Sequence, residues 1–139
     1  MDIFVYGTLR DEGVRNAVLG HPVDAFEPAV KPGHSARLVK GEAYPMIKPM
    51  AGLNAEGMIL KGLSAEDIAI LDRFEGENYQ RMATDVMLAD GRVFETEMYV
   101  EIAGRDEDGP FDLDGWLVAK REDFIQSFMM GRGFDRPED

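Results

Sequence analysis

The tripeptide Ala89-Asp90-Gly91 constrains the fold of this chain more than any other feature. It separates two runs of strand-forming residues, Tyr79 to Leu88 and Arg92 to Ile102. Asp-Gly between two such runs is a strong signal for a β-hairpin, because glycine adopts the positive φ angle that a tight hairpin turn requires. We therefore expect two antiparallel strands in the second half of the chain. Their order within a sheet is left open by the sequence.

A capped helix is expected before this hairpin. Ser64-Ala65-Glu66-Asp67 has the form of a capping box, in which the serine and the acid three residues later satisfy each other's backbone N–H groups. A helix from about Ala65 to Glu75 follows, and Gly76 is its natural end. Its apolar residues fall on one broad face that would pack on the core, namely Leu63, Ile68, Ile70, Leu71 and Phe74.

Glu75 lies at the edge of that apolar face when successive residues are placed ~100° apart. Partial loss of solvent and the negative end of the helix dipole would both raise the pKa of a carboxyl at this position. A carboxyl with a raised pKa is suited to proton transfer near neutral pH. The alternative is a frayed helix end with Glu75 in solvent, and the helix pattern alone favours that alternative.

The first residues of the chain raise a second question of function. Residues 2 to 6 are expected to form a strand, which breaks at Gly7 before Thr8, and a short helix from Val14 to Leu19 follows. The glycine turn is either a plain strand end or a place where backbone N–H groups bind an anion or an oxyanion. No further glycines complete a dinucleotide-binding or P-loop motif here.

The remaining segments indicate a single mixed domain. Residues 22 to 60 alternate short apolar pieces with proline and glycine, which predicts short strands joined by irregular turns. Residues 104 to 114 are expected to form an acidic loop, Trp116 to Phe128 an amphipathic helix, and residues from about 131 to 139 a polar tail. We therefore predict one α+β domain over residues 1–139, with a curved or barrel-like sheet.

Composition excludes several classes of function. A net charge of −12 makes nucleic acid and anionic membranes poor partners, and no stretch approaches the ~20 apolar residues that span a bilayer. The chain has no cysteine and shows no signal-peptide pattern, so a cytoplasmic location is expected. The two histidines, His21 and His34, are expected in exposed loops, and no metal or other cofactor is expected.

Three segments together resemble the gamma-glutamylcyclotransferase-like superfamily, and most closely its gamma-glutamylamine cyclotransferase-type members. They are Phe4-Val5-Tyr6-Gly7-Thr8-Leu9, Tyr44-Pro45, and Leu71-Asp72-Arg73-Phe74-Glu75-Gly76 followed by Tyr79-Gln80-Arg81. The resemblance extends from Met1 to about Val100. It implies a small mixed β-barrel with flanking helices. It also implies a cavity between the glycine turn and the end of the helix whose last residue is Glu75.

The resemblance also implies a reaction and a set of site residues. The reaction is an intramolecular acyl transfer that converts a small-molecule gamma-glutamyl amide to 5-oxoproline and a free amine. Glu75 matches the catalytic glutamate, acting as general base and then as general acid. The substrate-binding residues implied are Tyr6, Gly7, Thr8 and Leu9, with Tyr79 and Tyr99 lining the cavity. Arg10 and Arg81 are the cations nearest these motifs in sequence.

Two other classes of function stay open at this point. The first is a non-catalytic module on the same fold that binds or senses a small molecule. The second is a protein-interaction domain that docks a basic partner on the acidic residues 106 to 114, for which a solvated loop is the simpler interpretation. The sequence does not define the amine leaving group or the oligomeric state.

Overall fold

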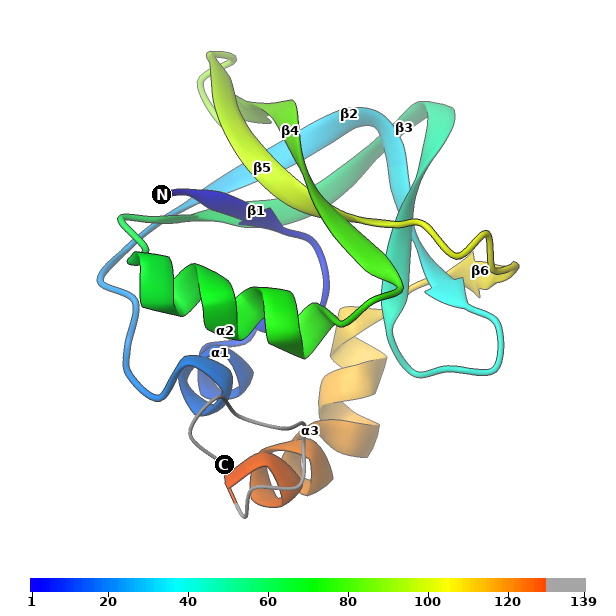
Figure 1. Ribbon diagram of the computed structural model, residues 1–139. Helices are drawn as coiled ribbons and strands as arrows, with labels where there is room; N and C mark the ends of the chain where they lie inside the picture. Colours follow the sequence, from blue (N-terminus) through cyan, green and yellow to red (C-terminus); the bar gives the residue numbers. More distant parts are fainter. Residues whose placement is uncertain (130–139) are drawn as a thin grey trace.

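The computed structural model describes residues 1–129, and the polar tail expected at about 131–139 lies outside them (Figure 1). In chain order the elements are β1 (Ile3–Val5), the 3₁₀ helix η1 (Thr8–Arg10), α1 (Glu12–Leu19), β2 (Ala25–Val39), β3 (Pro45–Lys61), α2 (Ala65–Glu75), β4 (Tyr79–Leu88), β5 (Val93–Glu101), β6 (Glu107–Pro110) and α3 (Leu113–Met129). Within the described residues, no helix combines the length and the apolar character needed to cross a membrane.

Five of the strands close into a mixed β-barrel. Their order is β3-β1-β5-β4-β2, and β2 pairs again with β3, which closes the ring. β1 runs parallel to β5, whereas the other pairs are antiparallel. The three α-helices gather below the barrel in the view of Figure 1. The expected α+β fold, a small mixed β-barrel with flanking helices, is confirmed.

The hairpin and the capped helix were predicted correctly. β4 and β5 pair in register from Tyr79 opposite Glu101 to Met87 opposite Val93. In α2, the Ser64 hydroxyl accepts from the Asp67 N–H while the Asp67 carboxylate accepts from the Ser64 N–H. Gly76 ends α2 with a φ of 80°, a left-handed angle that favours glycine. Both elements are defined by local signals.

The prediction of short strands between residues 22 and 60 is wrong. This region forms the long hairpin of β2 and β3, which pair along their lengths with a register shift between Pro32 and His34. Within residues 1–129, β2 pairs with β4 only at Ala29 and Val30 and meets β6 near its far end. Most of its second edge therefore lacks a partner strand, and an unpaired edge tolerates prolines, which cannot donate a backbone hydrogen bond.

The acidic segment from 104 to 114 is only partly a loop. Residues Glu107–Pro110 form β6, which pairs antiparallel with β2 through Arg37 and Val39. The Arg37 guanidinium lies 2.7 Å from the Glu107 carboxylate, so this acidic strand is held by a cation of its neighbour. The helix predicted from Trp116 to Phe128 is present as the longer α3.

Alternation along β1 separates two apolar cores. Ile3 and Val5 face a core shared with the helices, whereas Phe4 and Tyr6 face the barrel interior. α1 packs into the first core through a buried face and is capped by the Asp11 carboxylate, which accepts from the Val14 N–H. The strand that ends at the glycine turn is therefore fixed on both faces, and so is the position of the turn.

Candidate active site

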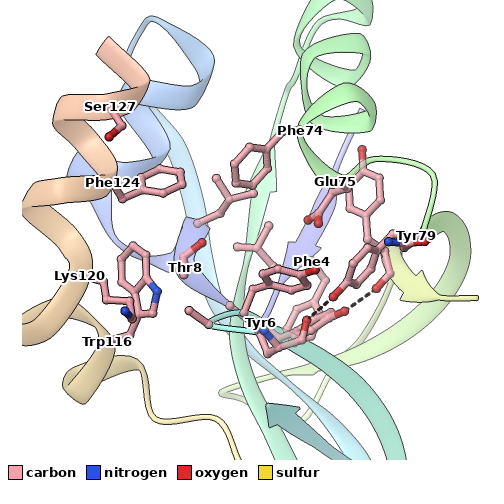
Figure 2. Close-up of a pocket in the computed structure, with 18 of the residues that line it drawn as sticks. Phe4, Tyr6, Thr8, Phe74, Glu75, Tyr79, Trp116, Lys120, Phe124 and Ser127 are labelled. Carbon is pink, nitrogen blue, oxygen red and sulfur yellow. Dashed lines mark hydrogen bonds between the residues drawn. The ribbon is translucent and has the colours of Figure 1, made fainter. Parts of the chain in front are cut away.

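A cavity of about 540 Å³ lies between the end of the barrel and helix α3. Its lining is mostly apolar and comes from β1 and η1, the segment 43–45, the last turn of α2, the start of β4, Tyr99 of β5, and α3. The volume falls within the ~300–1,000 Å³ typical of small-molecule sites. In Figure 2, Glu75 and Tyr79 lie on one side, Trp116 and Lys120 on the other, and Thr8 between them.

All of the site residues expected from the sequence line this one cavity. They are Tyr6, Gly7, Thr8, Leu9, Glu75, Tyr79 and Tyr99. They come from five parts of the chain, namely the turn at Tyr6 and Gly7, η1, the end of α2, β4 and β5, so only the closed barrel brings them together. Their catalytic and binding roles stay predictions.

Glu75 is the last residue of α2, and its carboxyl faces the cavity. Burial raises the pKa of Glu75 from the ordinary 4.5 to about 8. The frayed, solvated alternative is therefore not what the structure shows. Desolvation is the cause, because a carboxylate surrounded by apolar and aromatic side chains loses the water that stabilises its charge.

Three tyrosines near Glu75 are held by short hydrogen bonds. The Tyr6 hydroxyl donates to the Tyr99 carbonyl at 2.6 Å, and the Tyr79 hydroxyl donates to the Pro45 carbonyl at 2.7 Å, as Figure 2 shows. The Tyr99 hydroxyl donates to Asp72 Oδ1 at 2.6 Å. Burial raises the pKa of all three phenols, and the negative charge of Glu75 adds to this. They remain neutral donors that fix the ring positions.

The glycine turn continues directly into η1. Its hydrogen bonds run from the Arg10 N–H to the Gly7 carbonyl and from the Asp11 N–H to the Thr8 carbonyl. Gly7 has a negative φ of −121°, so it is not held in the left-handed conformation. Glycine is needed here for space: a Cβ at Gly7 would lie 2.8 Å from Pro45 Cγ. The turn and Pro45 thus pack directly against each other at the cavity wall.

Sequence reasoning missed two contributors to the site. Trp116, Lys120 and Phe124 of α3 form the wall opposite Glu75. Their spacing of four residues places them on one helix face, which was a usable signal. The second contributor is Arg105, which donates to the Tyr44 hydroxyl at 2.7 Å and lies over the rings of Tyr44 and Tyr79.

The other charged residues considered from the sequence lie elsewhere. Arg10 is not among the residues that line the cavity, and Arg81 faces Asp72 and Glu97 instead. His34 lies within β2, so its placement in a loop was wrong. His21 is exposed as expected, with Nε2 2.6 Å from Asp67 Oδ1. Among residues 1–129, no cluster of three or more His, Cys, Asp or Glu could hold a metal ion.

Comparison with known proteins identifies the class of this fold and site. The family described as gamma-glutamyl cyclotransferase, AIG2-like, matches residues 3–117. AIG2-like protein C of Arabidopsis thaliana is 34% identical over 127 residues, which cover 89% of this chain and 73% of the relative. AIG2-like protein A of the same plant is 28% identical over 130 residues, which cover 91% and 78%.

Solved structures agree with this match. The solution structure of an Arabidopsis thaliana protein superimposes with a TM-score of 0.69 at 27% identity, covering 91% of this chain and 87% of that one. A gamma-glutamyl cyclotransferase has a TM-score of 0.66 and covers 99% and 89%, and at 16% identity it shows a shared fold. The chain belongs to the gamma-glutamyl cyclotransferase, AIG2-like family.

Proposed function

We propose that this protein is a cyclotransferase that converts a gamma-glutamyl amide to 5-oxoproline and a free amine. The observation that carries the proposal is Glu75, a carboxyl with its pKa raised to about 8 at the wall of a mostly apolar cavity. A desolvated carboxylate lowers the stability of the fold, so its presence here suggests a function. A pKa near 8 suits proton transfer near neutral pH.

The substrate carries its own nucleophile, so the protein must supply position and proton transfer. The α-nitrogen attacks the γ-carbonyl carbon, a ring C–N bond forms, and the amide C–N bond breaks. Of the three protons on the starting ammonium group, one stays on the ring nitrogen and two end on the departing amine. Glu75 accepts these two protons one after the other from the attacking nitrogen and gives each to the departing nitrogen, so it ends ionised, as it began.

Burial of the substrate supports this reaction in two ways. A cavity that holds the glutamyl chain folded brings amine and carbonyl together, and well-aligned intramolecular reactions gain effective molarities of ~10⁵ M or more. The raised pKa of Glu75 also brings its proton affinity close to that of an amine, so transfer in either direction costs little.

The glycine turn has a supporting role in the proposal. The first N–H groups of a helical turn have no acceptor within the turn, and those at Thr8 and Leu9 open η1 beside the cavity. They would receive the substrate α-carboxylate or the developing oxyanion. Aligned donors of this kind contribute ~3–4 kcal/mol in other enzymes.

The test is to incubate the purified protein with a panel of gamma-glutamyl amides and to identify the acid product by mass spectrometry. A cyclotransferase releases 5-oxoproline, whereas a hydrolase releases glutamate, which contains one more water. Matched N-acetylated substrates lack the nucleophilic amine and should yield nothing, and protein-free samples correct for spontaneous cyclisation. Release of glutamate, or no release from any substrate, would overturn the proposal.

A further inference from the structure

Aromatic side chains line the part of the cavity that faces Glu75. Trp116 and Phe124 of α3 lie with their ring centroids 5.7 Å apart, and Phe74 of α2 packs edge-on to Phe124 at 6.0 Å. All three rings line the cavity. Together they form an aromatic wall that has no part in the proton transfer proposed for Glu75.

The cavity is larger than a glutamyl group needs. Its volume is about 540 Å³. The about nine non-hydrogen atoms of a glutamyl acyl group would fill no more than about half of such a space, even at the ~30 Å³ that each water molecule takes in the liquid. The space beyond the reacting carbonyl is therefore left for the amine, and it is bounded by the aromatic wall.

Lys120 adds a positive charge to this wall. It lies on α3 between Trp116 and Phe124, lines the cavity and is exposed. Within the described part of the chain, no carboxylate lies within 4 Å of its ammonium group. In a protein of net charge −12, a cation at a cavity wall without a partner of its own points to an anionic group of the ligand.

We propose that α3 forms the subsite for the leaving amine, and that it selects an α-amino acid with a large apolar or aromatic side chain. The side chain packs on Trp116, Phe74 and Phe124, and the carboxylate lies at Lys120. This inference rests on the cyclotransferase function proposed above and specifies its substrate class.

The subsite residues lie partly inside and partly beyond the segment that matches the family. The family match ends at residue 117, so Lys120 and Phe124 lie beyond it. The residues around Glu75 and the glycine turn lie inside it. Phe74 and Trp116 of the subsite lie inside it as well.

Trp116 is the only tryptophan in the chain, so its fluorescence reports binding at this wall directly. We would titrate the Glu75→Gln variant, which should bind ligands with little turnover, with three compounds. Gamma-glutamylphenylalanine carries both ring and carboxylate, gamma-glutamylphenethylamine lacks only the carboxylate, and gamma-glutamylalanine lacks only the ring. The phenylalanine compound should bind about tenfold or more tighter than the alanine compound, from burial of the ring. The phenylalanine compound should also bind about 5- to 10-fold tighter than gamma-glutamylphenethylamine, because only the former has the carboxylate that contacts Lys120.

Variants on the same background locate the carboxylate contact. Adding Lys120→Met should abolish the preference for gamma-glutamylphenylalanine over gamma-glutamylphenethylamine. The affinity for gamma-glutamylphenethylamine should change by less than about twofold. Adding Asp123→Asn, which removes a negative charge from the same wall, should strengthen binding of the phenylalanine compound. The control Arg92→Met removes one positive charge at the β4–β5 turn, at the far end of the molecule from α3, and should change neither ratio (Figure 1).

The outcomes separate the two proposals. Equal binding of the phenylalanine and phenethylamine compounds, or a preference that survives Lys120→Met, overturns the carboxylate contact. Equal binding of the phenylalanine and alanine compounds overturns the aromatic subsite, and so does the absence of any fluorescence response. If the predicted binding pattern is seen but the wild-type protein releases no 5-oxoproline, the subsite stands and the catalytic proposal fails.

Discussion

The two walls of the cavity are built on opposite principles. At the barrel wall, the Tyr6 and Tyr79 hydroxyls donate to backbone carbonyls at 2.6 and 2.7 Å, and burial raises the pKa of the Glu75 carboxyl beside them. At the α3 wall, Lys120 is exposed and has no ion pair within the described residues. Proton transfer needs groups in fixed positions, whereas a binding subsite needs groups that are free to contact the ligand. We therefore expect substitutions at the barrel wall to lower turnover and substitutions at the α3 wall to change affinity.

The largest expected effect comes from Glu75→Gln, which keeps the shape of the side chain but cannot accept a proton. Turnover of gamma-glutamyl substrates should fall about 10²- to 10⁴-fold, the usual contribution of a general acid–base group. Steady-state release of 5-oxoproline measures this. A folded variant with near-wild-type turnover would contradict a catalytic role for Glu75 at the barrel wall.

The same substitution should leave the fold equally or more stable. The folded pKa of about 8 exceeds the ordinary 4.5, so the folded protein keeps a proton that the unfolded chain has lost. Stability of the wild type therefore falls as pH rises from about 4.5 to about 8, by at most ~1.4 kcal/mol per pH unit. Urea unfolding of Glu75→Gln should lack this decline. A wild-type stability that rises over that range would contradict a desolvated Glu75.

Gly7→Val should lower activity about 10- to 100-fold, because its Cβ would push on Pro45 and shift the cavity wall. Stability should fall too, by about 1–3 kcal/mol, as is usual for overpacking. The sharper comparison uses Gly7→Ala with and without Pro45→Ala. If space against Pro45 is the only need, the double variant regains much of the activity that Gly7→Ala loses, and no recovery would show that the glycine serves the ligand itself.

Arg105→Met tests whether the contacts of Arg105 with Tyr44 and Tyr79 hold the barrel wall in place. It removes the donor to Tyr44 and leaves the Glu101 carboxylate, whose side chain is 5% exposed, without its partner at 2.6 Å. We expect a loss of about 1–3 kcal/mol in stability and a KM raised up to about tenfold. Adding Glu101→Gln should restore stability but not KM. Restoration of both would mean that Arg105 acts only on the fold.

The smallest effect is expected for Arg10→Ala. The arginine follows the glycine turn in sequence but does not line the cavity. KM should change by less than about threefold, because this charge lies outside the cavity lining. A loss of turnover above ~100-fold, which corresponds to nearly 3 kcal/mol, would instead place Arg10 in the catalytic set.

The elements that the sequence predicted well are those with local signals. The capping box from Ser64 to Asp67 and the Asp90-Gly91 turn act within a few residues, so both α2 and the β4–β5 hairpin could be placed. The β2–β3 hairpin was not predicted as two long strands, because the prolines and glycines in these residues were interpreted as strand ends. Whether a proline is tolerated depends on which edge of the strand has a partner, and that is decided by pairing across the barrel.

The site divides in the same way. The residues on the barrel wall were predicted through their resemblance to a known family, and the helix pattern alone did not favour a desolvated Glu75. The α3 wall was not predicted at all. The spacing of Trp116, Lys120 and Phe124 shows that they share a helix face, but only the tertiary packing of α3 shows that this face meets a cavity.

The pH dependence of kcat/KM for 5-oxoproline release reports the pKa of Glu75 in the free enzyme. In the mechanism, free Glu75 must be ionised to accept the ammonium proton, and its pKa is raised to about 8. We therefore expect kcat/KM to rise about tenfold per pH unit through neutrality and to level off near pH 8. A profile already flat above about pH 5.5, as a carboxyl with the ordinary pKa of 4.5 would give, would contradict this expectation.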